Sequence, residues 1–241
     1  MFVVGIGPGN HLDRTKRAEL AIAQSSVVVG YKPYLESIID LTEGKLLISS
    51  GMRAEIERCT LAIEHASAGK TVSLISSGDP GVYGMAGLAL EIAQKSKSSC
   101  VIRIVPGVTA ATAAAAALGA PLMTDFAVIS LSDLLVSWDQ IEKRLKAVAE
   151  SGMVTVLYNP KSNSRTDPFF KMIEIFKKFR PDTTPVGIVT NASSEGELVT
   201  ITTLSELASS DVCMKSVIII CNELTNTSNN YLIAQRGYRV E

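Results

Sequence analysis

Short apolar runs alternate along the chain with longer stretches in which apolar residues recur every three to four positions. The first apolar runs have the length of a buried strand and cover residues 2–6, 26–30, 45–48, 71–75 and 101–105. Of the stretches between them, residues 53–68 place Ile56, Cys59 and Ile63 on one helical stripe, which ends at Gly69. Strands that alternate with helices in this way predict a mainly parallel sheet covered by helices.

A second series of the same kind follows a helix-like run at residues 109–118 and the turn-forming residues 119–121, where we place a domain boundary. Its strand-like runs cover residues 126–130, 153–158, 185–190, 198–202 and 216–221. Residues 138–150 form an amphipathic run, and Asp167-Pro168 suits the start of another helix. The pattern therefore predicts two α/β domains of similar size, residues 1–119 and 120–241, with a ligand cleft between them.

Composition excludes several classes of protein. The chain has 241 residues, of which 46% are hydrophobic, and a formal net charge of −1, so it offers no basic surface for nucleic acid. No apolar run reaches the ~18 residues that span a bilayer, and a strand-like run stands where a signal peptide would begin. The four cysteines and two histidines have no metal-binding spacing. We therefore expect a cytoplasmic protein with reduced thiols, no metal and no membrane or nucleic-acid partner.

Two glycine-rich segments follow strand-like runs, which is where open α/β sheets bind small ligands. In residues 76–84 (SSGDPGVYG), glycines allow a ligand to approach the backbone and Pro80 stiffens the turn. Residues 5–10 (GIGPGN) do not match the dinucleotide fingerprint G-x-G-x-x-G, because the third glycine comes one position early and the acid expected after the second strand is missing. For each segment, an ordinary strand-to-helix turn is the alternative.

The sequence also lacks a nucleophile elbow, a P-loop and a convincing Cys–His pair. This combination favours chemistry in which the substrates carry the reactivity and the protein aligns them. Methyl transfer from a sulfonium donor is a reaction of this type.

Four segments, taken together, resemble the tetrapyrrole (corrin and sirohaem) methyltransferase family: residues 4–9 (VGIGPG), 77–84 (SGDPGVYG), 105–111 (VPGVTAA) and 156–160 (VLYNP). Further runs are similar to its ring-contracting branch, which methylates C-17 of precorrin-3B or cobalt-factor III in cobalamin biosynthesis: residues 29–34, 49–53, 125–135 and 186–192. The resemblance covers nearly the whole chain. It implies a two-domain α/β homodimer that takes S-adenosylmethionine as methyl donor and a tetrapyrrole as substrate.

The resemblance also assigns residues to the two ligands. It places donor contacts on Pro8, Gly78, Asp79, Val82, Thr109, Ala110, Tyr158, Asn159, Asn191 and Ala192. It places Pro8 beside both the donor and the macrocycle, and we expect Gly7 and Gly9 of the same loop to contact the substrate. The acidic side chains of the macrocycle need cationic partners, and the candidates near the motif loops are Lys32, Arg53, Lys161 and Arg165, for each of which a solvated surface charge is the alternative. Many donor contacts in the family are made by the backbone, so Asp79 is expected either to accept hydrogen bonds from the donor or to order its loop.

The general acid or base is left unassigned by the sequence. Members of the branch often carry Gly-His before the Asp-Phe pair, where this chain has Met123-Thr124. Asp125, Ser130, Ser132 and His11 are the candidates for proton transfer. Three other functions stay open: methylation at another position of a precorrin or of uroporphyrinogen, nicotinamide-dependent oxidoreduction, and binding of a corrinoid without catalysis.

Overall fold

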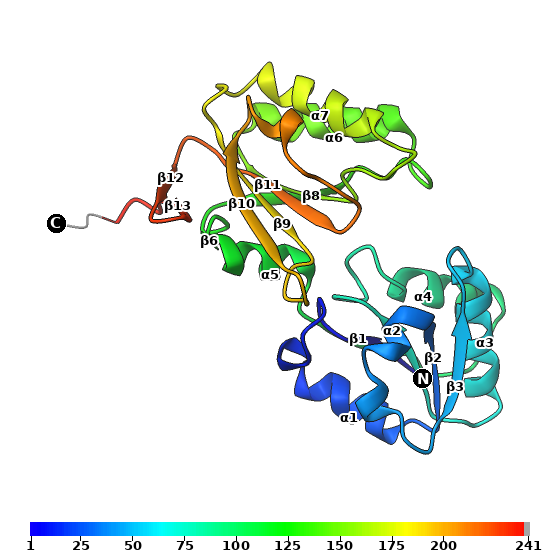
Figure 1. Ribbon diagram of the computed structural model, residues 1–241. Helices are drawn as coiled ribbons and strands as arrows, with labels where there is room; N and C mark the ends of the chain where they lie inside the picture. The colour runs from blue at the N-terminus through cyan, green and yellow to red at the C-terminus, as the bar shows by residue number, and fades with distance from the viewer. Residues whose placement is uncertain (239–241) are drawn as a thin grey trace. The chain divides into compact units, whose positions relative to one another are not determined.

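The chain divides into two compact units in the computed structural model, which describes residues 1–238 (Figure 1). The first unit is Met1–Ala110 and the second begins at Ala111. The division thus falls at the start of helix α5 (Ala110–Leu118), whereas the sequence pattern placed it after this helix. Helix α5 packs within the second unit, because a Cβ added to Gly187 of strand β9 (Pro185–Thr190) would lie 2.4 Å from the Leu118 side chain.

Five parallel strands form the sheet of the first unit, in the order β3-β2-β4-β1-β5. The strands are β1 (Phe2–Gly5), β2 (Val27–Tyr31), β3 (Leu46–Ser50), β4 (Val72–Ser76) and β5 (Arg103–Val105). The helices are α1 (Lys16–Gln24), α2 (Lys32–Glu36), α3 (Glu55–Ser67) and α4 (Ala86–Lys95). The predicted parallel sheet is confirmed, with small differences at the strand ends.

Helices cover both faces of this sheet, which explains why β1, β2 and β4 are apolar along most of their length. On one face, Val3 packs in a cluster with Cys59 of α3 and Ala89 of α4. On the other face, Val4 packs in a cluster with Ile22 of α1. Since all five strands point the same way, the loops that follow them lie along one edge of the sheet, which we call the carboxyl edge.

The second unit contains a five-stranded mixed sheet in the order β10-β9-β11-β8-β7. The strands are β7 (Phe126–Ser130), β8 (Val154–Tyr158), β9 (Pro185–Thr190), β10 (Leu198–Thr203) and β11 (Ser216–Ile220). Strand β7 is parallel to β8, and β11 is antiparallel to both β8 and β9. Strands β7, β8 and β9 therefore point the same way, and their carboxyl ends share one edge. The predicted α/β class and strand positions are confirmed.

Two helices, α6 (Trp138–Glu150) and α7 (Asp167–Lys177), cover this second sheet. Leu145 of α6 and Phe176 of α7 are fully buried in the same cluster as Leu157 of β8. A small third sheet, which the pattern did not predict, joins β12 (Thr225–Ser228), β13 (Tyr231–Ala234) and β6 (Gly119–Ala120). Within residues 1–238, no helix is long and apolar enough to cross a membrane.

Candidate functional site

Three loops meet at the carboxyl edge of the first unit, because the strands that they follow are neighbours in the sheet. The first loop (residues 6–10) follows β1, the second (77–85) follows β4, and the third (106–109) follows β5. The first two loops pair through their backbones: Gly7 N donates to Gly78 O at 3.2 Å and Gly78 N donates to Gly7 O at 2.7 Å. Both glycines have a left-handed backbone, with φ of 81° and 61°. Glycine is favoured at such positions because it lacks a Cβ.

The Asp79 carboxylate joins the second loop to the third. Its Oδ1 accepts from Gly81 N at 2.7 Å, and its Oδ2 accepts from Gly107 N at 3.0 Å. A Cβ on Gly107 would lie 2.1 Å from Gly78 O, and a Cβ on Gly5 would lie 2.6 Å from the same oxygen. These glycines therefore allow the loops to contact one another, a reason that the sequence analysis had not considered.

The remaining candidates of the first unit also lie at its carboxyl edge. Gly9 of the first loop is exposed, and His11 follows it, exposed, in the short 3-10 helix His11–Asp13. Lys32 comes directly after β2 and Arg53 follows β3, both with exposed side chains. The structure thus brings the predicted substrate residues to the same edge as Pro8, Gly78, Asp79, Val82, Thr109 and Ala110.

Tyr34 and Arg58 are further residues at this edge that the sequence analysis had not singled out. Burial raises the pKa of the Tyr34 hydroxyl above its ordinary value and outweighs the opposing effect of a hydrogen bond with Ser77 of the second loop. Arg58 is 3% exposed and donates to Ser50 Oγ at 2.8 Å and to Gly51 O at 2.9 Å. The aromatic residues of the run 31–34 (YKPY), directly after a strand, were the available signal for Tyr34.

The second unit gathers its candidates at the carboxyl ends of β7, β8 and β9. Tyr158 Oη accepts a hydrogen bond from Ala111 N at 2.7 Å, which satisfies an amide in the first turn of α5. Asn159 Nδ2 donates to Ser130 Oγ at 3.0 Å. Asn191 and Ala192 follow β9 at the same edge. Asn159 and Asn191 both have a left-handed backbone, with φ of 51° and 53°. Such uncommon conformations cluster at functional sites.

Arg165 holds the backbone of this edge in place. Its guanidinium donates to Leu131 O at 2.6 Å and to Asn159 O at 2.7 Å, and its Nε lies 3.8 Å from Asp133 Oδ1. The Arg165 guanidinium, which we expected from the sequence to bind a carboxylate of the substrate, is thus engaged by the protein itself. Arg165 is thus a structural residue of the loops that follow β7 and β8.

Asp125 lies away from the other candidates of the second unit. It precedes β7, and its carbonyl accepts from Val154 N at the start of β8, whereas Ser130 and Tyr158 end these two strands. A five-residue strand separates the two positions, a distance of about 16 Å at the usual rise per residue. Within this unit, Ser130 is near Asn159 and Asp125 is not.

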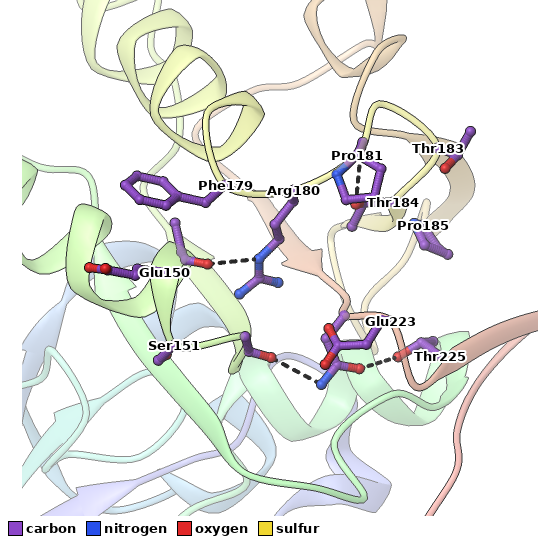
Figure 2. A pocket seen from close by; sticks show the side chains of 13 residues that line it. Glu150, Ser151, Phe179, Arg180, Pro181, Thr183, Thr184, Pro185, Glu223 and Thr225 are labelled. Carbon is purple, nitrogen blue, oxygen red and sulfur yellow. Dashed lines mark hydrogen bonds between the residues drawn. The ribbon is translucent and has the colours of Figure 1, made fainter.

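A cavity of about 450 Å³ lies at that opposite edge of the second sheet. Figure 2 shows the side chains that line it, from residues that precede β8 and β9 and follow β11. Its buried cation, Arg180, donates to the carbonyls of Val148, Ala149, Met153 and Cys221. Asn222 on the wall is likewise bonded to Gly152 O. Because the cavity's main cation is held by the protein itself, we regard Arg180 as a structural joint between elements. In the described part of the chain, no three His, Cys, Asp or Glu residues group as metal ligands.

Comparison with known proteins extends over nearly the whole chain. A probable cobalt-factor III C(17)-methyltransferase of Salmonella typhimurium is 44% identical over 238 residues, which are 99% of both chains. A precorrin-3B C(17)-methyltransferase of Sinorhizobium is 36% identical over 91% of this chain and 87% of its own. The cobalt-factor III methyltransferase of Priestia megaterium is 40% identical, but this chain spans only 45% of its length.

Solved structures of methyltransferases superpose on this chain over nearly its whole length. The methyltransferase CobJ superposes with a TM-score of 0.90 at 33% identity, over 97% of this chain and 98% of its own. A uroporphyrin-III C-methyltransferase of Thermus thermophilus, in complex with S-adenosylhomocysteine, superposes with a TM-score of 0.70 at 25% identity over 91% of both chains. The family model of the tetrapyrrole (corrin/porphyrin) methylases matches residues 1–208. The resemblance found in the sequence is thereby confirmed, and the chain belongs to the tetrapyrrole (corrin/porphyrin) methylase family.

Proposed function

We propose that this protein transfers a methyl group from S-adenosylmethionine to C-17 of a reduced tetrapyrrole, with contraction of the ring, in cobalamin biosynthesis. The substrate is cobalt-factor III or precorrin-3B. The observation that carries the proposal is the 44% identity, over 99% of both chains, to the Salmonella relative named for this activity. The structure of CobJ supports a methyltransferase. The structure of the uroporphyrin-III C-methyltransferase with S-adenosylhomocysteine supports S-adenosylmethionine as the donor.

The donor would supply an activated methyl group on a sulfonium centre. The residues that would hold it are Pro8, Gly78, Asp79, Val82, Thr109 and Ala110 in the first unit, and Tyr158, Asn159, Asn191 and Ala192 in the second. The loops fit such a ligand because they join into one surface, through the Gly7–Gly78 pairing and the Asp79 carboxylate. Backbone amides and carbonyls on such a surface suit recognition of a small polar ligand.

The nucleophile in this reaction is a carbon atom of the substrate, so the protein has to align the reactants, exclude water and move protons. Ser130 is the best placed of the proton-transfer candidates in the second unit. Its Oγ accepts from Asn159 Nδ2 at 3.0 Å and from Ser132 N at 3.2 Å. These two accepted bonds leave the hydroxyl hydrogen to point toward another partner, which suits donation to a developing negative charge. In the first unit, His11 is the candidate for proton transfer.

Cationic side chains at the carboxyl edge of the first unit would bind the carboxylates of the macrocycle. Lys32 and Arg53 are both exposed and follow neighbouring strands. Lys32 makes a long, exposed contact of 3.9 Å with Glu36, so this ammonium group can turn to an acidic ligand at little cost. Methylation at another position of a precorrin or of uroporphyrinogen is the alternative for the same site.

The first test is a calorimetric titration with S-adenosylhomocysteine, with NAD as the control. Saturable binding of the first ligand alone is expected, and binding of NAD instead would overturn the proposal. Anaerobic turnover with cobalt-factor III, precorrin-3B and uroporphyrinogen then identifies the substrate. The expected product gains one methyl group, at C-17 by carbon-13 labelling. Binding of the tetrapyrrole without turnover would identify a carrier protein.

We also propose that the protein is a homodimer, as the resemblance to the family implies. Light scattering coupled to size-exclusion chromatography measures the mass of the particle directly. A monomeric mass across the concentration range of the activity assay would contradict this proposal.

A further inference from the structure

The loop between β7 and α6 presents two adjacent leucines whose side chains are exposed in the described part of the chain. Leu134 is 72% exposed and Leu135 is 98% exposed, the highest value of any large apolar side chain in residues 1–238. A single exposed leucine is ordinary, but here two adjacent leucines are exposed in the loop that follows β7, at the edge of the second sheet where Ser130 and Asn159 lie.

Buried residues hold this pair in place from both sides. Leu131, at the start of the loop, is 0% exposed and its amide donates to Tyr158 O at 2.9 Å. Val136 and Trp138, at its end, pack partly buried against the same hydrophobic core. The loop therefore places its other apolar residues inside and leaves only Leu134 and Leu135 outside.

The base of the loop shares its hydrogen bonds with the candidate site. The guanidinium of Arg165 links Leu131 O to Asn159 O, with distances of 2.6 and 2.7 Å. Ser130 Oγ accepts both from the loop amide of Ser132 and from the side chain of Asn159. The leucine pair is thus tied to the end of β8, where the donor residues Tyr158 and Asn159 lie.

We infer that Leu134 and Leu135 contact the apolar face of the tetrapyrrole ring and contribute to its selection. This inference rests on the proposed function. A tetrapyrrole is a broad, largely apolar ring with acidic groups at its periphery, and it needs apolar protein surface as well as cations. The side chains of Ser130, Asn159 and Asn191 at the same edge are polar, so they suit the donor or a peripheral group better than the ring. Covering the two leucines with the ring would remove apolar area of both partners from water.

The test is the double variant Leu134→Ser/Leu135→Ser in the full chain. Its matched control is Leu20→Ser/Leu90→Ser, which alters two leucines of α1 and α4 that are 51% and 48% exposed. Binding of the tetrapyrrole is followed by quenching of Trp138, the single tryptophan of the chain. Calorimetry gives the affinity for S-adenosylhomocysteine, and light scattering gives the oligomeric state.

We expect the loop variant to raise the Kd and the KM for the tetrapyrrole about tenfold, because part of two buried side chains is lost. The affinity for S-adenosylhomocysteine and the particle mass should stay unchanged, as should every value for the control variant. Leu134→Met/Leu135→Met should restore most of the tetrapyrrole affinity, since it keeps the apolar surface.

An unchanged tetrapyrrole Kd in the loop variant would overturn the inference. A changed particle mass with unchanged tetrapyrrole Kd would do so too, and would show that a second copy of the chain covers the leucines. The proposed function can fail while the inference stands. This is the outcome if the wild-type protein binds the tetrapyrrole without methylating it and the loop variant binds it more weakly.

Discussion

Asp79 acts on the candidate site through the backbone of its own protein. Each of its carboxylate oxygens accepts a hydrogen bond from a backbone amide, one from Gly81 and one from Gly107. A carboxylate in this arrangement makes two charge-assisted hydrogen bonds to the backbone of the loops around it. We therefore regard Asp79 chiefly as the residue that orders its loop, one of the two roles expected for it from the sequence.

Asp79→Ala should weaken the binding of S-adenosylhomocysteine by about tenfold, because the third loop is then no longer joined to the second. Gly107→Ala should have a similar effect, since its Cβ would lie 2.1 Å from Gly78 O and force the same loops apart. Because both substitutions break one contact, their effects should not add in the double variant.

Calorimetric titration of the two single variants and the double variant measures this coupling. Asp211→Ala removes an exposed carboxylate of the second unit and serves as the control. Fully additive losses would contradict the loop-ordering role and would favour a separate contact between Asp79 and the donor.

We expect the reactivity of the cysteine thiols to depend on their burial. Burial raises the pKa of Cys59 to about 11 and that of Cys221 to about 12. At pH 8, below both values, these groups stay protonated and therefore unreactive, whereas Cys213 is exposed. Iodoacetamide at pH 8 should modify Cys213 and spare Cys59 and Cys221 until the protein is unfolded. Peptide mass spectrometry measures the label, and rapid modification of Cys59 in the native protein would contradict the packing described.

At the scale of elements, Arg180 joins the ends of three segments of the second unit. Its guanidinium donates hydrogen bonds to the carbonyls of Val148 and Ala149 in α6, of Met153 before β8, and of Cys221 after β11. Its guanidinium also lies 5.1 Å from the centre of the Phe176 ring. Basic residues at the end of a helix commonly interact with the helix dipole while their charge stays in solvent. The structure places Lys178 in solvent but buries Arg180.

Arg180→Met should lower the free energy of unfolding by about 3–5 kcal/mol, since several buried carbonyls lose their partner at once. Lys178→Met is the matched control and should change it by less than about 0.5 kcal/mol. Urea denaturation followed by circular dichroism measures both values. Equal stability of the two variants would show that water replaces the guanidinium at no cost.

At the scale of the whole molecule, each unit has its own core. The two clusters on either face of the first sheet are made entirely from residues of the first unit, and the large cluster of the second unit from its own residues. All five strands of the first sheet likewise pair within residues 1–110. Nothing in the pairing of the first sheet requires the rest of the chain.

A fragment of residues 1–110 should therefore unfold cooperatively in urea, with a free energy on the order of 5 kcal/mol. The control fragment, residues 1–100, lacks the edge strand β5 and leaves one side of β1 unpaired. It should show no cooperative transition. A non-cooperative 1–110 fragment would show that the first unit depends on the second for stability.

Local sequence patterns were sufficient to predict the positions of most strands and the parallel arrangement of the strands in the first sheet. Runs such as residues 71–75 are short, apolar throughout and separated by helical stretches, which already predicts a parallel sheet with both faces covered. The convergence of the first two glycine-rich loops was also predictable, because both follow strands of that sheet. The four family segments carried the functional assignment, since their residues and order are properties of the chain itself.

The tertiary structure alone decided the direction of β11, the opposite placement of Asp125 and Ser130, the burial of Arg180 and the partners of Asp79. Asp125 and Ser130 are close in sequence and stand at either end of one strand, a distinction that needs the strand's boundaries and neighbours. Asp79 and Gly107 come together because β4 and β5 flank β1 in parallel, so that the loops after them end at the same edge of the sheet. Periodicity reports which residues are buried, but strand order and the contacts that follow from it depend on pairing between segments distant in the chain.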